Sequence, residues 1–161
     1  MSLGPVTRVR MNRLLPLLAI VSLLAGCAEF SSRVVPTVKL GSYQHVYVQH
    51  SLTDGRGLDG IIAQELRRLG YDAGAGPLTL MPKNTELIVM YQDRWSWDFT
   101  TYMIELDMQV MTAHSGRMLA DARTFRPSIL GHAPVELIDQ ILDKWFKPRV
   151  PSVPQTPPVD N

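Results

Sequence analysis

The stretch Glu86-Leu87-Ile88-Val89-Met90-Tyr91 is the part of the sequence that decides the fold. From Leu87 onward it is a near-continuous apolar run. Such a run is typical of a central strand that is covered on both faces. We therefore expect a sheet with this strand, residues 86–95, near its middle.

The segment that follows, residues 101–112, alternates between apolar and polar residues, which predicts a strand with one buried face. The alternation assigns to the core the residues Tyr102, Ile104, Leu106, Met108 and Val110, and to solvent Glu105, Asp107 and Gln109. Ser115-Gly116 predicts a tight hairpin turn before a return strand over residues 117–125. Across that hairpin we expect Asp107 to pair with Arg123.

Two segments have the spacing of amphipathic helices. Residues 58–69 place apolar side chains three and four positions apart, and Gly70 follows where a left-handed cap belongs. A second helix is predicted from Pro134, which suits a first helical position, to the residues before Pro148.

Shorter strands are predicted at residues 43–50 and 71–73. The first of these, the helix and the next strand require a crossover, whereas the later strands form antiparallel hairpins. The order predicts an α+β fold, a mixed four- to five-stranded sheet with two helices packed on one face, within a domain over residues 41–147. Residues 148–161 are rich in proline and are expected to be a disordered tail.

The N-terminus has the pattern of an export signal. Arginines between residues 8 and 13 precede a short apolar run over residues 14–24, and small residues follow. A membrane span needs about 20 apolar residues, so the run is too short and indicates a secretory signal. Translation from Met1 or from Met11 would give a complete signal.

The signal closes on Leu24-Ala25-Gly26-Cys27, which is similar to the lipobox of bacterial lipoproteins. The resemblance implies removal of residues 1–26 and lipidation of Cys27, with residues 27–40 as a tether. Positions 28 and 29 lack the aspartate that tends to retain enterobacterial lipoproteins at the inner membrane. We therefore expect a lipid anchor in the bacterial outer membrane, on its periplasmic face, in preference to the inner membrane.

Composition and motifs argue against several classes of function. The net charge of +1 does not favour a nucleic-acid partner. Cys27 is the only cysteine, so the folded part has neither a disulfide nor a thiolate metal site. His45 and His50 lie an odd number of residues apart on one strand, so they face opposite sides. No serine has a nucleophile-elbow context. We expect no catalytic residues, no metal and no cofactor.

The most unusual local pattern is Trp95-Ser96-Trp97-Asp98-Phe99. An extended backbone would place Trp95, Trp97 and Phe99 on one face, beside the charges of Arg94 and Asp98. Aromatic residues and arginine are over-represented at binding hot spots, so these five residues are a candidate contact surface. The alternative is that the rings only cover the end of the sheet.

From residue 43 to residue 146 the chain resembles the small bacterial lipoproteins grouped as the DUF4136-type family. The resemblance is carried by the lipobox, Leu69-Gly70-Tyr71, the stretch 86–91, Ser115-Gly116-Arg117-Met118-Leu119-Ala120 and Trp145-Phe146. It implies an α+β periplasmic domain on a lipid anchor and brings no catalytic residues.

The sequence thus predicts a membrane-anchored, non-catalytic interaction or accessory module of the bacterial cell envelope. Its expected partners are the membrane, through the lipid on Cys27, and an envelope protein. The alternative is a binder of a small envelope ligand such as a glycan or a lipid fragment, with a hydrolase a distant third.

Overall fold

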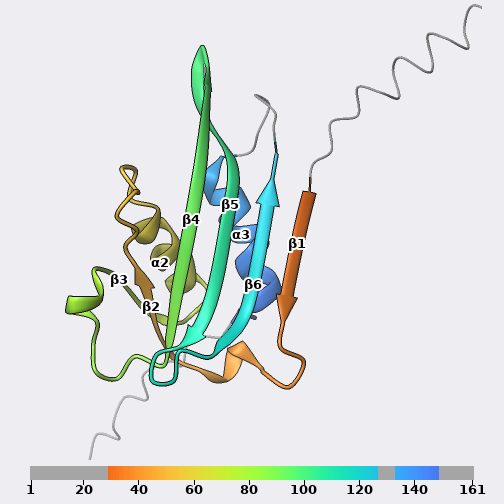
Figure 1. Ribbon diagram of the computed structural model, residues 1–161. Coiled ribbons are helices and arrows are strands. Elements are labelled where there is room, and N and C mark those ends of the chain that lie inside the picture. The colour runs from red at the N-terminus through yellow and green to blue at the C-terminus, as the bar shows by residue number, and fades with distance from the viewer. Residues whose placement is uncertain (1–28, 127–132, 149–161) are drawn as a thin grey trace, which may run out of the picture.

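The computed structural model describes residues 29–126 and 133–148, which form a six-stranded sheet with two α-helices (Figure 1). The strand order is β1-β6-β5-β4-β2-β3. In chain order the elements are β1 (Glu29–Val34), η1 (Leu40–Ser42), β2 (His45–Gln49), α2 (Leu58–Arg68), β3 (Asp72–Gly76), η2 (Leu78–Leu80), β4 (Leu87–Asp98), β5 (Thr100–Thr112), β6 (Met118–Phe125) and α3 (Pro134–Trp145).

The sheet is mixed. β2 runs parallel to both β3 and β4, whereas β4, β5, β6 and β1 pair antiparallel. The parallel neighbours arise because α2 forms the crossover between β2 and β3. The predicted α+β class is confirmed, with one strand more than expected.

The helix boundaries follow the local sequence. Gly70 has φ of +90°, and the backbone N–H of Tyr71 closes the end of α2 by donating to the Leu66 carbonyl at 3.1 Å. Pro134 opens α3 at a position where no helical hydrogen bond is lost. Both predicted helices are therefore confirmed, and Figure 1 shows them on the same side of the sheet.

The additional strand is β1, in a segment that the sequence predicts to be part of the tether. It pairs with β6 in register, from Glu29 opposite Phe125 to Val34 opposite Ala120. Alternate residues of β1 contact α3 on the helix side of the sheet. Phe30 packs on the core beneath the Lys144 ammonium, 4.0 Å from the ring centroid. The Ser32 hydroxyl accepts a hydrogen bond from the Trp145 indole at 3.0 Å.

The expectation that β4 is covered on both faces holds at Ile88, which is buried at 9% exposure, and fails at Met90, which is partly exposed. Leu87, Val89 and Tyr91 face the helices and are buried. Ile88 and Met90 alternate with them, so they point to the other face, where the described part of the chain places no helix. We call this second face the uncovered face.

A β-bulge changes which residues of β5 reach the core. Arg94 lies opposite Glu105, but Trp95 lies opposite Met103, so Ile104 is an extra residue in the ladder. Met103 is consequently buried at 2% exposure, while Ile104 and Tyr102 are partly exposed. The predicted core assignment holds for Leu106, Met108 and Val110 and fails for these two residues.

We expect Met103→Ala to lower the free energy of unfolding by about 2–5 kcal/mol, because it leaves a cavity in the core. Ile104→Ala, at the neighbouring bulged position, should cost about 1 kcal/mol or less. Urea denaturation of both variants gives the comparison. A larger loss for Ile104→Ala would contradict the bulge.

Candidate functional site

The end of the β4–β5 hairpin carries two of the three predicted aromatic contacts. Trp97 is 72% exposed and Phe99 is 94% exposed, and their ring centroids lie 6.3 Å apart. Phe99 occupies the turn with φ of +57°, which is a genuine outlier for a bulky residue. Asp98 lies between them and is also exposed. We call Trp97 and Phe99 the aromatic tip.

Trp95 does not belong to this tip. It packs against the hydrophobic core, and its indole N–H donates to the Asp93 carboxylate at 2.5 Å. The guanidinium carbon of Arg56 lies over the Trp95 ring, 4.1 Å from its centroid. The structure therefore divides the aromatic row, with Trp95 at the base of the hairpin and the two other rings in solvent.

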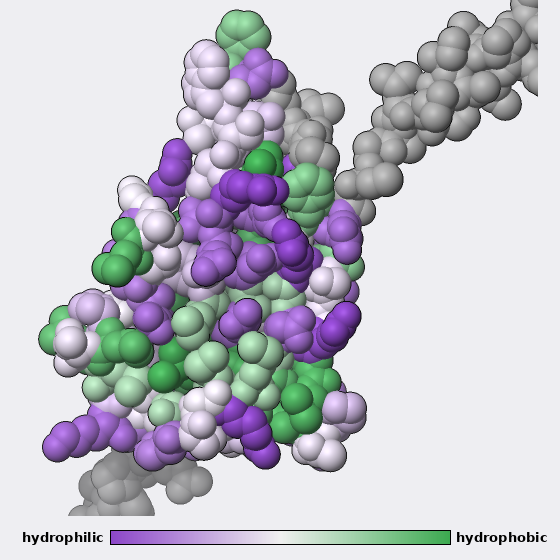
Figure 2. Space-filling view, in the orientation of Figure 1, coloured by the Kyte–Doolittle hydropathy of each residue, from purple (hydrophilic) through white to green (hydrophobic). Residues whose placement is uncertain are grey.

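Arg94 is engaged on the uncovered face. Its guanidinium lies 2.6 Å from the Glu105 carboxylate, which also accepts a hydrogen bond from Arg123. Arg123 lies 3.6 Å from Asp107, so the predicted cross-strand pair is confirmed. These residues form the polar half of the uncovered face, which Figure 2 shows as a purple band across the middle of the molecule.

The other half of the uncovered face is apolar. Towards the β5–β6 turn its strands contribute Met90 and Met111, which are partly exposed, and Met118, which is 44% exposed, beside the buried Ile88. Figure 2 shows this area as mostly green and pale green below the polar band. An open sheet face that is apolar over part of its area is a feature of surfaces that contact other molecules.

A cavity of about 380 Å³ opens between the uncovered face and the loop after β2. It is lined by Gln49, His50, Ser51, Leu52, Thr53, Met90, Tyr91, Gln92, Asp107 and Gln109. No pattern in the sequence predicts this cavity. The only signal in the sequence was a row of polar residues at the alternate, solvent-facing positions of the strands. Such a row ordinarily marks a face that is exposed to water.

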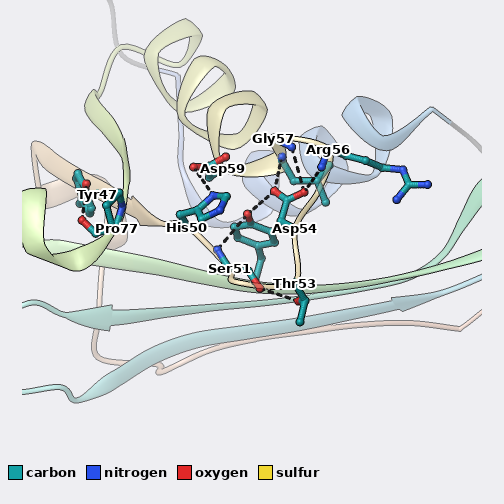
Figure 3. A network of polar contacts seen from close by, with 11 residues as sticks. Tyr47, His50, Ser51, Thr53, Asp54, Arg56, Gly57, Asp59 and Pro77 are labelled. Atoms are coloured by element: carbon teal, nitrogen blue, oxygen red, sulfur yellow. Dashed lines mark hydrogen bonds and ion pairs between the residues drawn. The ribbon is translucent and has the colours of Figure 1, made fainter.

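Asp54 holds the loop beside the cavity in place (Figure 3). Its carboxylate accepts hydrogen bonds from the backbone N–H groups of Arg56, Gly57 and Leu58 at 2.6–3.0 Å. It also accepts one from the Tyr91 hydroxyl at 2.6 Å. Asp54 therefore caps α2 and joins the loop to β4.

These contacts set the pKa of Asp54. Burial by itself raises the pKa of the carboxyl, but the hydrogen bonds from Tyr91 and the backbone outweigh it and bring the pKa below the ordinary value of 3.8. Burial of the Tyr91 hydroxyl and its contact with the charged Asp54 raise the pKa of that hydroxyl well above 10. Tyr91 is therefore a donor and not a base at neutral pH.

His50, Asp54 and Asp59 bring potential ligand atoms within 4.8 Å of one another. Other contacts already use these groups. The His50 ring lies 3.1 Å from Asp59, and both Asp54 oxygens accept hydrogen bonds at the start of α2. The hydrogen bonds at the start of α2 and the His50–Asp59 contact explain why these three side chains lie close together, so we infer no metal site from them.

The predicted lipidation of Cys27 and the predicted signal over residues 1–26 lie outside the described residues, as does the predicted tail over residues 148–161 except Pro148. Among the described helices, none is long and apolar enough to cross a membrane.

Solved structures of two bacterial proteins have a similar fold. Two structures of the PelC dodecamer from Paraburkholderia phytofirmans give TM-scores of 0.55 and 0.51 at 15% and 12% identity, and the match covers 76% of this chain and 100% and 97% of PelC. A DUF4136 family protein from Bacteroides thetaiotaomicron gives 0.52 at 6% identity, covering 76% of this chain and 98% of that protein.

These likenesses show the fold alone, and they support the DUF4136 resemblance at that level. No protein-family model matches the chain, and no curated protein sequence is similar to it.

Asp54→Asn should lower the free energy of unfolding at pH 7 by about 1–3 kcal/mol, because an amide keeps only one acceptor oxygen for these donors. A carboxyl with a lowered pKa stabilises the fold above pH 3.8, and this contribution is lost as the pH falls through the folded-state pKa. The difference between the two proteins should therefore shrink in acid. Denaturant titrations across that pH range test this, with Asp98→Asn on the exposed tip as the control. An unchanged difference in acid would contradict the assignment.

Proposed function

We propose that the chain is a lipoprotein that acts as a non-catalytic interaction module on the periplasmic side of the bacterial cell envelope. The observation that carries the proposal is the position of β1. It begins at Glu29, two residues after the lipobox-like cysteine, and it is integrated into the sheet. A lipid on Cys27 would thus attach almost directly to the folded domain, without a long tether.

The anchor chemistry follows from Cys27. A cysteine thiolate is a good nucleophile for taking up a diacylglycerol group. Two or more acyl chains give stable membrane attachment, whereas one chain is marginal. The residues after the cysteine favour the outer membrane over the inner membrane.

The uncovered face is the surface that supports an interaction role. Its apolar half is contiguous with a network of charged side chains, so it combines burial energy with directional contacts. The similar PelC structures are dodecamers. A second copy of this chain is accordingly the first partner to test, ahead of another envelope protein.

The non-catalytic assignment rests on how the titratable groups near the cavity are used. Asp54 and Tyr91 hold each other and the start of α2, and His50 pairs with Asp59. Each of these groups has a structural partner, which leaves them poorly placed to act as a base or a nucleophile.

The cavity favours a second candidate, a binder of a small envelope ligand. Its volume of about 380 Å³ falls within the range of ligand pockets, roughly 300–1,000 Å³. Gln92 and Gln109 offer amides, and one buried oxygen of Asp107 is ion-paired with Arg123 at 3.6 Å but accepts no hydrogen bond. Those groups suit the hydroxyl groups of a glycan fragment.

Cys27→Ser tests the anchor. The wild-type chain should carry a diacylglyceryl group and an added acyl chain by intact mass, and it should fractionate with outer membranes on a density gradient. The serine variant should keep its unmodified mass and leave the membrane fraction, because the hydroxyl does not accept the lipid. Ser31→Ala, nearby on β1, should behave as the wild type. An unmodified wild-type protein would overturn the proposal.

Met118→Glu tests the uncovered face. If copies associate through its apolar half, a charge at this exposed position should weaken self-association by about tenfold or more. Gln109→Glu adds the same charge to the polar part of that face and should have a smaller effect. Analytical ultracentrifugation of the acylated protein in detergent measures both. A wild-type protein that stays monomeric would exclude a second copy as the partner.

A further inference from the structure

The β4–β5 hairpin extends past the rest of the sheet. Glu29, Phe125, Glu105 and Arg94 lie in one row across β1, β6, β5 and β4. One step beyond that row the Arg126 N–H still donates to the Ile104 carbonyl at 2.8 Å, and past it, among the described residues, β4 and β5 pair only with each other up to the turn at Phe99 (Figure 1). At about 3.3 Å per residue, the turn stands about 16 Å beyond the row.

The projecting part is rich in aromatic residues and nearly free of charge. From Trp95 to Tyr102 its only charged residue is Asp98. Two rings at its end, Trp97 and Phe99, are largely in solvent. The left-handed backbone of Phe99 adds strain at the same place. Such strain, together with exposed rings, indicates a contact that the isolated domain does not supply.

The described chain begins at the same end of the molecule, so a lipid on Cys27 would attach there. β1 is antiparallel to β6, so its first residue, Glu29, lies beside the last residue of β6 and at the end towards which the hairpin projects (Figure 1). Cys27 precedes Glu29 by two residues, which span at most about 7 Å. With the hairpin upright on the membrane, the aromatic tip would therefore reach about 9 Å further than the lipidated residue.

We propose that the aromatic tip, Trp97 and Phe99, inserts into the interfacial layer of the bilayer that holds the lipid on Cys27. The inference rests on the proposed lipoprotein function and names the partner of its aromatic end. Tryptophan is enriched at membrane–water interfaces, and apolar faces of interfacial segments lie about 5–10 Å into the boundary between headgroups and acyl chains. The reach of the tip beyond Cys27 matches that depth. The carboxylate of Asp98 is favoured among the polar headgroups, so it limits insertion of the tip to this layer.

The size of the tip favours a lipid surface over a protein. Two aromatic side chains bury roughly 300–500 Å² together, whereas a stable protein interface buries about 800 Å² on each partner. A narrow, convex ribbon end offers little further area. A bilayer sets no such requirement, because it closes around a projecting side chain.

Attachment at two points would also orient the domain. The lipid alone leaves the domain free to tilt, but a second contact at the hairpin end holds the strands upright. The uncovered face and its cavity would then open sideways along the membrane and not towards it.

The test uses the acylated full chain, purified from membranes and reconstituted into phosphatidylcholine vesicles with or without brominated acyl chains. Intact mass first verifies the acyl chains. Bromine quenches tryptophan at short range, and Trp145 is buried while Trp95 packs on the core. Because Trp97 is one of three tryptophans, we expect brominated lipid to remove about a third of the emission.

Two variants assign the effect to the tip. Trp97→Thr should abolish the quenching, and Phe99→Thr should reduce it at least twofold by withdrawing the tip. Leu80→Thr is the matched control, because Leu80 is as exposed as Trp97 but precedes β4 at the opposite end, and its quenching should equal that of the wild type.

The outcomes separate the two proposals. Acylated protein that floats with the vesicles but shows equal emission in both lipids would overturn membrane insertion and leave the lipoprotein function standing. The same result with a cross-link from position 97 to a protein would assign the tip to a protein partner. A chain without acyl groups would overturn the lipoprotein function, and the membrane inference with it.

Discussion

The antiparallel ladder between β4 and β5 is the constraint on which the rest of the structure depends. Both strands place fully buried residues towards the helices, among them Val89, Leu106 and Val110, and each then supports one half of the sheet. The bulge opposite Arg94 shifts the alternation, so that Met103 enters the core and Trp95 packs at the base of the hairpin. Past the bulge, the same ladder continues as a free ribbon and carries the aromatic tip.

The position of both helices on one side leaves the other face of the sheet without a helix in the described part of the chain. The described chain covers the first face with apolar stripes from α2 and α3. The second face keeps an ion-pair network around Glu105, an apolar area around Met118, and the cavity. The buried Asp107 oxygen on this face lies 3.6 Å from the Arg123 guanidinium and accepts no hydrogen bond.

The fold determines little about the partner. Structures that share it have 6–15% identity to this chain, so their likeness reflects how a mixed sheet and two helices pack. The first residue of β1 and the hairpin turn lie at the same end, and the uncovered face runs between that end and the opposite turn near Gly116.

The sequence by itself determined the parts that depend on local spacing: both helices with Gly70 and Pro134 at their ends, the long strands with the glycine turn, and from them the α+β class. It also predicts the export signal, which stays a prediction. Only the tertiary structure decided that β1 joins the sheet, that Ile104 leaves the core, that the aromatic row divides, and that a cavity forms beside Asp107. Each of these depends on strand pairing between residues distant in the chain. Local periodicity cannot encode such a register, because one extra residue in a ladder reverses the side on which its neighbours lie.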